Sequence, residues 1–391
     1  MALFKRSSLK ISSITTSFFV RNFSKTDSVK GKNIKKSVFV SQSKDIYTNL
    51  ALQEWLYKKF DFTNHHVLMI WQNDPCVIIG VHQNPWLETN YADLNENGVH
   101  LARRCSNGEA MYQDNGNLNL TFFSPRGRYN SKYNTEIISR GLFREFGLKI
   151  NTDDEELLIR NNKQFSCKAA KIGEQNAYNF YSLMVRMNKV DENIVLQKHN
   201  VAIKTGPTIS TDTYIKKMNL CEENPQISSE SVVKAVGWEF LRTKPLSLED
   251  AGIEYANQQK GFHLVNPTES WFPGLNEIRD TYNSWDWCYG KTPSFNVSQT
   301  FNVPGEWNQN SGASTQIKVT MKVENGRIAD IIIFIPYGSL SMGETKAVHN
   351  FRGKKFSIRT LNDLEESLGG LLLDDRDKSV SQCLKQVTSH A

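Results

Sequence analysis

The sequence predicts an α+β fold with a large N-terminal domain and a smaller C-terminal one. Short strand-like runs bounded by Asn, Gly, Pro and Asp alternate with segments of helical spacing, and the pattern changes from Pro293 onward. The chain has 391 residues, of which 39% are hydrophobic and 23% charged. That is enough apolar material for sizeable cores, which excludes a wholly disordered chain. No stretch approaches 18 consecutive apolar residues, so the sequence predicts no transmembrane helix.

The first 36 residues differ sharply in charge from the rest. They hold nine Lys and Arg against a single acid, Asp27, whereas the remaining residues hold 38 basic and 40 acidic groups. The net charge of +6 therefore comes from this leader, and the body gives no electrostatic argument for nucleic-acid binding. Residues 1–26 are rich in Ser and Thr and lack acids, which is typical of a mitochondrial transit peptide. We expect residues 1–36 to be a transit peptide and basic linker of a mitochondrial matrix protein. The alternative is a disordered basic tail that carries no targeting signal.

Residues 37–292 are expected to form the large domain. A helix is predicted over 45–60, because Asp45 can cap its start and apolar residues recur at helical spacing. Further helices are predicted over 136–146, ending at Gly147, and over 229–242 and 276–284. Short runs bounded by turn residues predict strands at 66–71, 76–79, 99–103, 118–123, 164–172 and 178–186, the last two joined by a turn at 173–176.

Residues 293–391 are expected to form an accessory C-terminal α+β domain. Two strands are predicted over 316–323 and 328–335, because the Asn325-Gly326 pair between them suits a type I′ hairpin turn. A helix is predicted over 361–373.

Cysteine spacing gives no sign of a metal centre. The six cysteines form no C-x-x-C pair, so neither a zinc site nor a redox pair is predicted. They are Cys76, Cys105, Cys167, Cys221, Cys288 and Cys383.

Four stretches of the chain share order and spacing with one protein family. They read IGVHQNPWLE over 79–88, RRCSNGEAMYQDNGN over 103–117, QFSCKAAKIG over 164–173 and WDWCYGKTP over 285–293. Together they resemble the lipoate–protein ligase and lipoyltransferase family, most of all its mitochondrial branch. The resemblance covers roughly residues 38–390 and implies a mixed-sheet domain of the biotin/lipoate-protein-ligase-like fold.

The resemblance also implies a chemistry. Such proteins bind lipoyl-AMP and pass the lipoyl group to a lysine of a lipoyl domain in 2-oxoacid dehydrogenases or of the glycine-cleavage H protein. A glycine-rich loop must admit the phosphate, and a fixed cation must stabilise the charge that develops on it. No cofactor is firmly predicted, since lipoyl-AMP is the family's ligand and its binding to this chain is doubtful. A monomer without a metal, a nucleic-acid partner or a membrane span is expected.

Many family positions keep a suitable residue. The resemblance assigns ligand-binding positions to Gln83, Arg103, Arg104, Ser106, Gly108, Tyr112, Asp114, Asn117 and Lys171. From the residues alone, the Asp114–Asn117 segment also fits an ordinary turn, and Lys171 also fits a surface lysine.

Other family positions are altered, and these alterations concentrate on the ligand. The family's three loop glycines are Asn107, Gly108 and Glu109 here, and its phosphate-contacting lysine aligns with Gln164. A carboxylate about 4 Å from a phosphate would repel it by roughly 4 kcal/mol at an effective dielectric of 20. The altered positions are Val81, Asn107, Glu109, Gln113, Gln164, Cys167, Asn179 and Phe180.

Neighbouring lysines replace the lost one poorly. On a regular strand, Lys163 points to the face opposite Gln164, whereas Lys168 shares its face but lies roughly 13 Å away. The sequence therefore favours a family member with lost or severely impaired lipoyl transfer and with no catalytic residue, so that enzyme status is uncertain. Two alternatives stay open: an active lipoyl or octanoyl transferase using Lys163, Lys168 or Lys171, and a structural protein with an occluded pocket.

Overall fold

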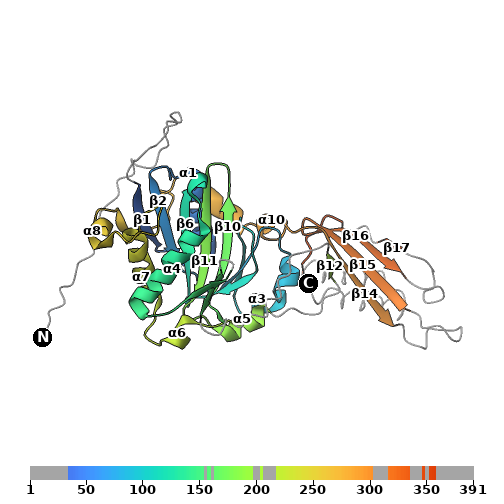
Figure 1. The fold of residues 1–391 in the computed structure, drawn as a ribbon. Coiled ribbons are helices and arrows are strands. Elements are labelled where there is room, and N and C mark those ends of the chain that lie inside the picture. Colours follow the sequence, from blue (N-terminus) through green and yellow to red (C-terminus); the bar gives the residue numbers. More distant parts are fainter. Residues whose placement is uncertain are drawn as a thin grey trace, which may run out of the picture.

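A computed structural model describes residues 34–153, 156–159, 163–196, 203–205, 217–302, 316–334, 346–347 and 352–357. The large domain is built on a six-stranded mixed sheet in the order β10-β11-β6-β2-β1-β13 (Figure 1). Strand β1 pairs in parallel with β2 and β13, and the other neighbours are antiparallel. The strands are β1 (Lys35–Ser41), β2 (His65–Trp71), β6 (Asn117–Pro125), β10 (Ser166–Ile172), β11 (Asn176–Met184) and β13 (Gly261–Val265).

Helices cover both faces of this sheet, which explains why β2 and β11 are buried along nearly their whole length. On one face, α4 (Ser131–Phe146) and α7 (Ser229–Arg242) close an apolar cluster that includes Ile138 and Phe240. On the other face, α1 (Ile46–Lys59) and α9 (Leu275–Asn283) close a second cluster, which includes Trp55. Shorter helices are α2 (Pro85–Glu88), α3 (Tyr91–Glu96), α5 (Lys189–Val195), α6 (Leu220–Glu223), α8 (Gly252–Asn257), α10 (Trp285–Cys288) and a 3₁₀ turn over Arg126–Arg128.

Three smaller sheets complete the described structure. One has the order β4-β3-β5 and joins β3 (Cys76–Ile79), β4 (His100–Arg103) and β5 (Met111–Gln113). Another joins β7 (Asn151–Asp153), β8 (Glu156–Ile159) and β9 (Lys163–Gln164). The third contains β12 (Ile203–Thr205), β14 (Phe295–Asn302), β15 (Gln316–Glu324), β16 (Arg327–Phe334) and β17 (Lys346–Ala347).

The predicted α+β class is confirmed, as are the predicted helices and strands within the described residues, except that the strand predicted over 164–172 is divided into β9 and β10. Asp45 accepts a hydrogen bond from the Thr48 amide at the start of α1, and Gly147 ends α4 at a φ of 66°. Asn325 and Gly326 both adopt positive φ between β15 and β16, as a type I′ turn requires. The helix predicted over 361–373 lies outside the described residues.

The first strand of the central sheet is not predicted from the sequence. Strand β1 begins at Lys35, so the last two residues of the expected leader belong to the fold. Lys36 is fully buried. A charge count alone assigns this lysine to a solvated tail. Strands β5, β13 and β14 were also not predicted, because they are short or follow no clear alternation.

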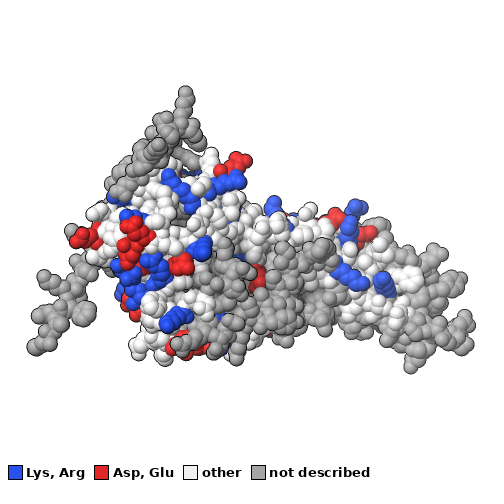
Figure 2. Space-filling view, viewed as in Figure 1, with Lys and Arg blue, Asp and Glu red and all other residues white. Residues whose placement is uncertain are grey.

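Charge is mixed over the visible face of the large domain, where patches of both signs lie side by side (Figure 2). Within the described residues, no helix is long and apolar enough to cross a membrane. The same part of the chain contains no group of three or more His, Cys, Asp or Glu arranged to hold a metal ion.

The Gly116 turn gives a direct test of packing at the end of the sheet. The Gly116 carbonyl accepts the amides of Val185 and Arg186, and a Cβ at Gly116 would overlap the Arg186 carbonyl. Gly116→Ala is therefore expected to lower the free energy of unfolding by about 1–3 kcal/mol. Urea denaturation measures this. Gly127→Ala is the matched control, because a Cβ there meets nothing within 4 Å. Equal effects of the two changes would contradict the packing argument.

Candidate functional site

The first three family-like stretches come together beside the central sheet. The loop after β3 and the loop between β4 and β5 touch so closely that a Cβ on Gly80 would overlap the Gly108 carbonyl. Gly108 has a φ of +119°, which favours glycine, and a Cβ there would lie 3.2 Å from the Lys168 carbonyl of β10. The loop over 106–109, named here the glycine loop, is therefore pressed between the neighbouring loop and β10.

Arg103 connects the loop after β3 to the segment over 288–292, which precedes the C-terminal sheet. Its guanidinium is completely buried and donates to the carbonyls of Gly80, Val81 and Gln83 at 2.8–3.2 Å. It also donates to the Cys288 carbonyl at 2.7 and 2.9 Å and to the Thr292 hydroxyl at 2.9 Å. Burial lowers the pKa of Arg103 to about 10, so it remains charged at neutral pH. The N–H groups of the guanidinium that could bind a phosphate are therefore engaged within the protein. Arg103 has a positioning role, because it holds the loop after β3 against the junction at Cys288.

Arg104 shapes the glycine loop from inside. It donates to the carbonyls of Ile78 and Asn107 at 3.3 Å and to that of Glu109 at 2.7 Å. Burial lowers its pKa to about 10 as well. A Cβ on Gly108 would lie 2.6 Å from its Nη2. The arginine therefore fixes the loop, and Gly108 is needed to make room for it.

The other retained positions also make internal contacts. Lys171 lies 2.8 Å from a Glu54 carboxylate oxygen and 4.4 Å from the centre of the Tyr57 ring. The Tyr112 hydroxyl lies 3.3 Å from the Asp191 carboxylate of α5. Internal bonds are likewise made by Gln83 to the Gly80 amide, Ser106 to the Val81 amide, Asp114 to the amides of Gly116 and Asn188, and Asn117 to the Asp114 amide.

Several of the positions that the resemblance marks as altered carry neutral or apolar groups. The Gln164 amide donates to the Ser166 carbonyl at 2.6 Å. Phe180 packs 5.6 Å from the Trp71 ring in a buried cluster that also contains Cys167. Gln113 joins a buried amide network with Asn73 and Asn119.

Asn179, another altered position, points to the α4 face of the central sheet. It donates to the Ser131 hydroxyl and accepts from the Asn134 amide, so it faces the start of α4. Among the remaining altered loop positions, Asn107 is exposed, whereas Val81 and Glu109 are half-buried.

A break in the strand corrects the expected orientation of Lys168. Strand β9 ends at Gln164, and β10 begins only at Ser166. Phe165 packs in the cluster under α4, whereas Cys167 and Ala169 pack in the cluster on the opposite face. Lys168 pairs with Tyr181, which belongs to the α4 side. The expectation that Lys168 shares the face of Gln164 is therefore wrong, because it assumed an unbroken alternation.

Lys217 is the cation that sequence reasoning missed. Its backbone forms a parallel bridge with Gln164, and residues so paired present their side chains to the same face. Its ammonium lies 2.8 Å from the Glu192 carboxylate of α5. Burial lowers the pKa of Lys217, but Cys167, Glu192 and Glu109 raise it more, so the net shift is upward. No motif marks this residue, because it lies 53 positions from Gln164 in the chain and meets it only through the fold.

Comparison with known structures defines the class as a lipoate-ligase-like α+β fold. The structure of Plasmodium falciparum LipL1 in complex with lipoate superposes with a TM-score of 0.54 at 22% identity, covering 90% of this chain and 99% of that one. A bipartite lipoate protein ligase studied with its E2 lipoyl domain from Thermoplasma acidophilum superposes with a TM-score of 0.51 at 20% identity, covering 65% of this chain and 96% of that one.

Sequence comparison identifies the family. The model of the lipoyl protein ligase A/B catalytic domain matches residues 45–241. The mouse protein named lipoyl amidotransferase LIPT1, mitochondrial, is 35% identical over 326 residues, which cover 82% of each chain. The chain therefore belongs to the lipoyl protein ligase A/B family and is similar to its lipoyltransferase members.

Replacing Arg103 tests its positioning role. Arg103→Met removes the guanidinium donor from the carbonyls of Gly80, Val81 and Gln83, and within the described residues only the Gly80 carbonyl keeps another donor, the Gln83 amide. The free energy of unfolding should therefore fall by about 3 kcal/mol or more. Urea denaturation of the full chain measures the loss. Arg126→Met, at an exposed arginine on the 3₁₀ turn, is the control and should change stability by less than about 0.5 kcal/mol. Similar stabilities for the two variants would contradict the role.

Proposed function

We propose that this family member has lost, or retains only severely impaired, transfer of lipoyl from lipoyl-AMP to acceptor lysines. The observation that carries the proposal is Gln164, which stands where the family has a lysine and donates its amide to the Ser166 carbonyl. A neutral amide cannot neutralise the charge that develops on an acyl phosphate. Removing one preorganised donor of this kind slows a reaction by about 10²–10³.

Other cations near the site are engaged. Arg103 and Arg104 donate to backbone carbonyls, and Lys171 pairs with Glu54. Glu192 pairs with Lys217 at 2.8 Å, and the carboxylates of Glu192 and Glu109 both raise the pKa of Lys217, so an incoming phosphate would compete with them for this lysine. Like charges in a partly buried site repel, which opposes binding as well as transfer.

The acyl side of the site is filled by the chain itself. Phe180, Tyr112 and Met184 are each at most 3% exposed and belong to one buried cluster. Because protein interiors are close-packed, a lipoyl chain entering here must displace side chains. This supports weak binding of the family ligand.

The leader and the similar proteins both support a mitochondrial location. The mouse relative is named mitochondrial, and the basic segment over residues 1–26, which lacks acids, agrees with import into the matrix. The Thermoplasma protein is described with an E2 lipoyl domain. We therefore propose contact with lipoyl-domain proteins or the H protein, made by a monomer. It has a leader that ends before β1, a transferase-like domain that begins with β1 at Lys35 and extends to residue 292, and an accessory domain over 293–391.

Transfer from preformed lipoyl-AMP to apo H protein tests the proposal. We expect no lipoyl gain on the acceptor above the protein-free control, and a rate about a thousandfold below that of an active family member run in parallel. Intact mass of the acceptor is the readout, and circular dichroism confirms that the chain is folded. Gln164→Lys alone should not restore transfer, because Glu109 remains. Stoichiometric lipoylation by the unaltered chain would sink the proposal.

One observation favours the second candidate, an active lipoyl or octanoyl transferase. Lys217 lies beside Gln164 and holds its positive charge. Exchange of Glu192 for a ligand phosphate would give the site a cation from the neighbouring segment. The lysines proposed from sequence are less suitable, since Lys171 pairs with Glu54 and Lys168 lies on the α4 side.

Substituting Lys217 separates the two candidates. If the chain is active, Lys217→Met should reduce transfer to the acceptor about a hundredfold or more, because it removes the cation whose backbone is bridged to Gln164. Lys163→Met, one residue from Gln164, serves as the control and should retain full rate. Equal rates for both variants would exclude Lys217 as the substitute cation.

A further inference from the structure

A cavity lies across the central sheet from the site described above. It has a volume of about 360 Å³, within the range of small-molecule sites. The ends of β2 and β6, the start of α4 and the segment after α7 enclose it. Its walls combine aromatic and polar groups, among them His66, Phe122, Arg128, Asn130, Tyr133 and Leu246.

A buried ammonium lies beneath the cavity. Lys36 is fully buried, and its Nζ donates to the Tyr133 hydroxyl and the Phe240 carbonyl at 2.8 Å and to the Thr243 carbonyl. Three acceptors around one nitrogen are the geometry of a protonated lysine. Burial lowers the pKa of Lys36, as expected for a cation bonded to neutral groups. Such a charge is costly unless an anion compensates it.

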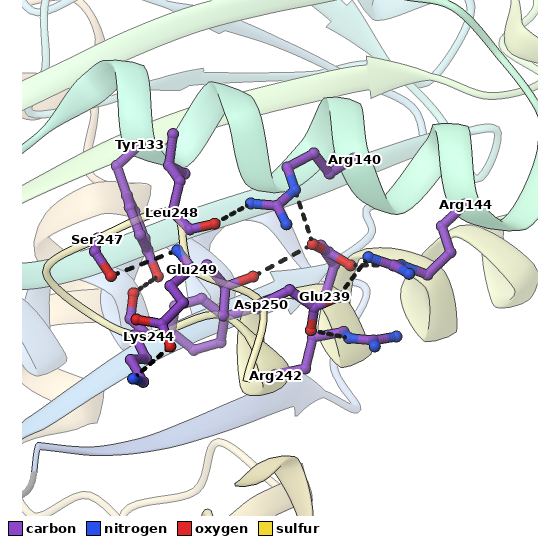
Figure 3. Close-up of polar contacts among 12 residues, drawn as sticks. Tyr133, Arg140, Arg144, Glu239, Arg242, Lys244, Ser247, Leu248, Glu249 and Asp250 are labelled. Carbon is purple, nitrogen blue, oxygen red and sulfur yellow. Dashed lines mark hydrogen bonds and ion pairs between the residues drawn. The ribbon is translucent and has the colours of Figure 1, made fainter. Parts of the chain in front are cut away.

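The carboxylates nearby are already matched by other cations. Glu239 is held between Arg140 and Arg144 at 3.0–3.2 Å (Figure 3). Asp250 meets Arg144 at 2.9 Å and Arg242 at 2.8 Å. Two carboxylates thus face three guanidiniums, so Glu239, the carboxylate that acts on Lys36, is shared with two arginines and compensates its charge only in part.

The cavity wall contributes further positive charge and a buried side-chain nitrogen that has no hydrogen-bond partner. Arg128 lines it, and so do Asn130 and Tyr133 at the N-terminus of the 16-residue helix α4, where the helix dipole favours an anion. His66 is 5% exposed, and its Nε2 has no hydrogen-bond partner. Burial, Lys36 and Arg128 lower its pKa to about 3, so the ring is neutral and its Nε2 can donate to an anion. Among the described residues that line the cavity, there is no carboxylate.

We propose that this cavity binds a small organic anion, a carboxylate with an aromatic or short aliphatic body. The charged group lies between Arg128, the start of α4 and His66 Nε2, above Lys36. The apolar body packs on Phe122 and Leu246. This site is separate from the one beside the glycine loop, from which the central sheet divides it, and it does not depend on whether lipoyl transfer survives.

Phenylacetate is the probe, and the full chain is titrated with it by calorimetry. We expect saturable binding of one molecule, and no comparable binding of neutral phenylacetamide, which has the same ring. Arg128→Gln should weaken phenylacetate binding about tenfold, the size of one charge-assisted hydrogen bond. Arg126→Gln is the matched control, because this arginine of the same 3₁₀ turn does not line the cavity. Equal affinity for the two probes, or equal effects of the two variants, would overturn the proposal.

Nitrogen NMR of the histidine rings places the bound probe. Phenylacetate should shift the ring signals of His66 and leave those of His263 on β13 unchanged. Binding without a shift at His66 would put the probe in another site and overturn the proposal, whatever its affinity.

Discussion

The arrangement of the candidate site depends on two buried guanidiniums. Arg103 and Arg104 are adjacent on the chain, point into different loops and bond almost entirely to backbone carbonyls. Together they fix the loop after β3, the glycine loop and the junction at Cys288. Because a buried guanidinium is tolerable only when its donors are satisfied, these loops must keep their shape for the domain to fold. The shape of these loops therefore contributes directly to the stability of the domain.

This dependence separates the scaffold from the chemistry. Substitutions at Asn107, Glu109 and Gln164 leave the arginine bonds intact, since the arginines bond to main-chain atoms. Under the proposed function, the same substitutions replace a positive charge with a neutral amide and add a carboxylate near the position that an acyl phosphate would take. A chain can thus keep the lipoyl protein ligase A/B fold while its capacity for lipoyl transfer declines.

Local signals predicted much of the fold. The Asp45 cap, the Gly147 stop and the Asn325-Gly326 turn depend on residues close in sequence, and all three appear as expected. What could not be predicted depends on contacts distant in sequence. In the sequence, Lys36 looks like part of the leader, but in the fold its ammonium donates to the carbonyls of Phe240 and Thr243. Lys217 contacts Gln164 only through a backbone bridge between segments distant in sequence. The break at Phe165 reverses the face of Lys168, and no composition rule reveals it.

The affinity of the full chain for a non-hydrolysable lipoyl-AMP analogue tests the central claim most directly, because it isolates the ligand site from the acceptor and from turnover. The account predicts binding at least about a thousandfold weaker than that of an active family member measured in the same buffer, as about 4 kcal/mol of charge repulsion implies. Comparable affinities would contradict it, since they would show that the site beside Gln164 still accommodates the acyl phosphate.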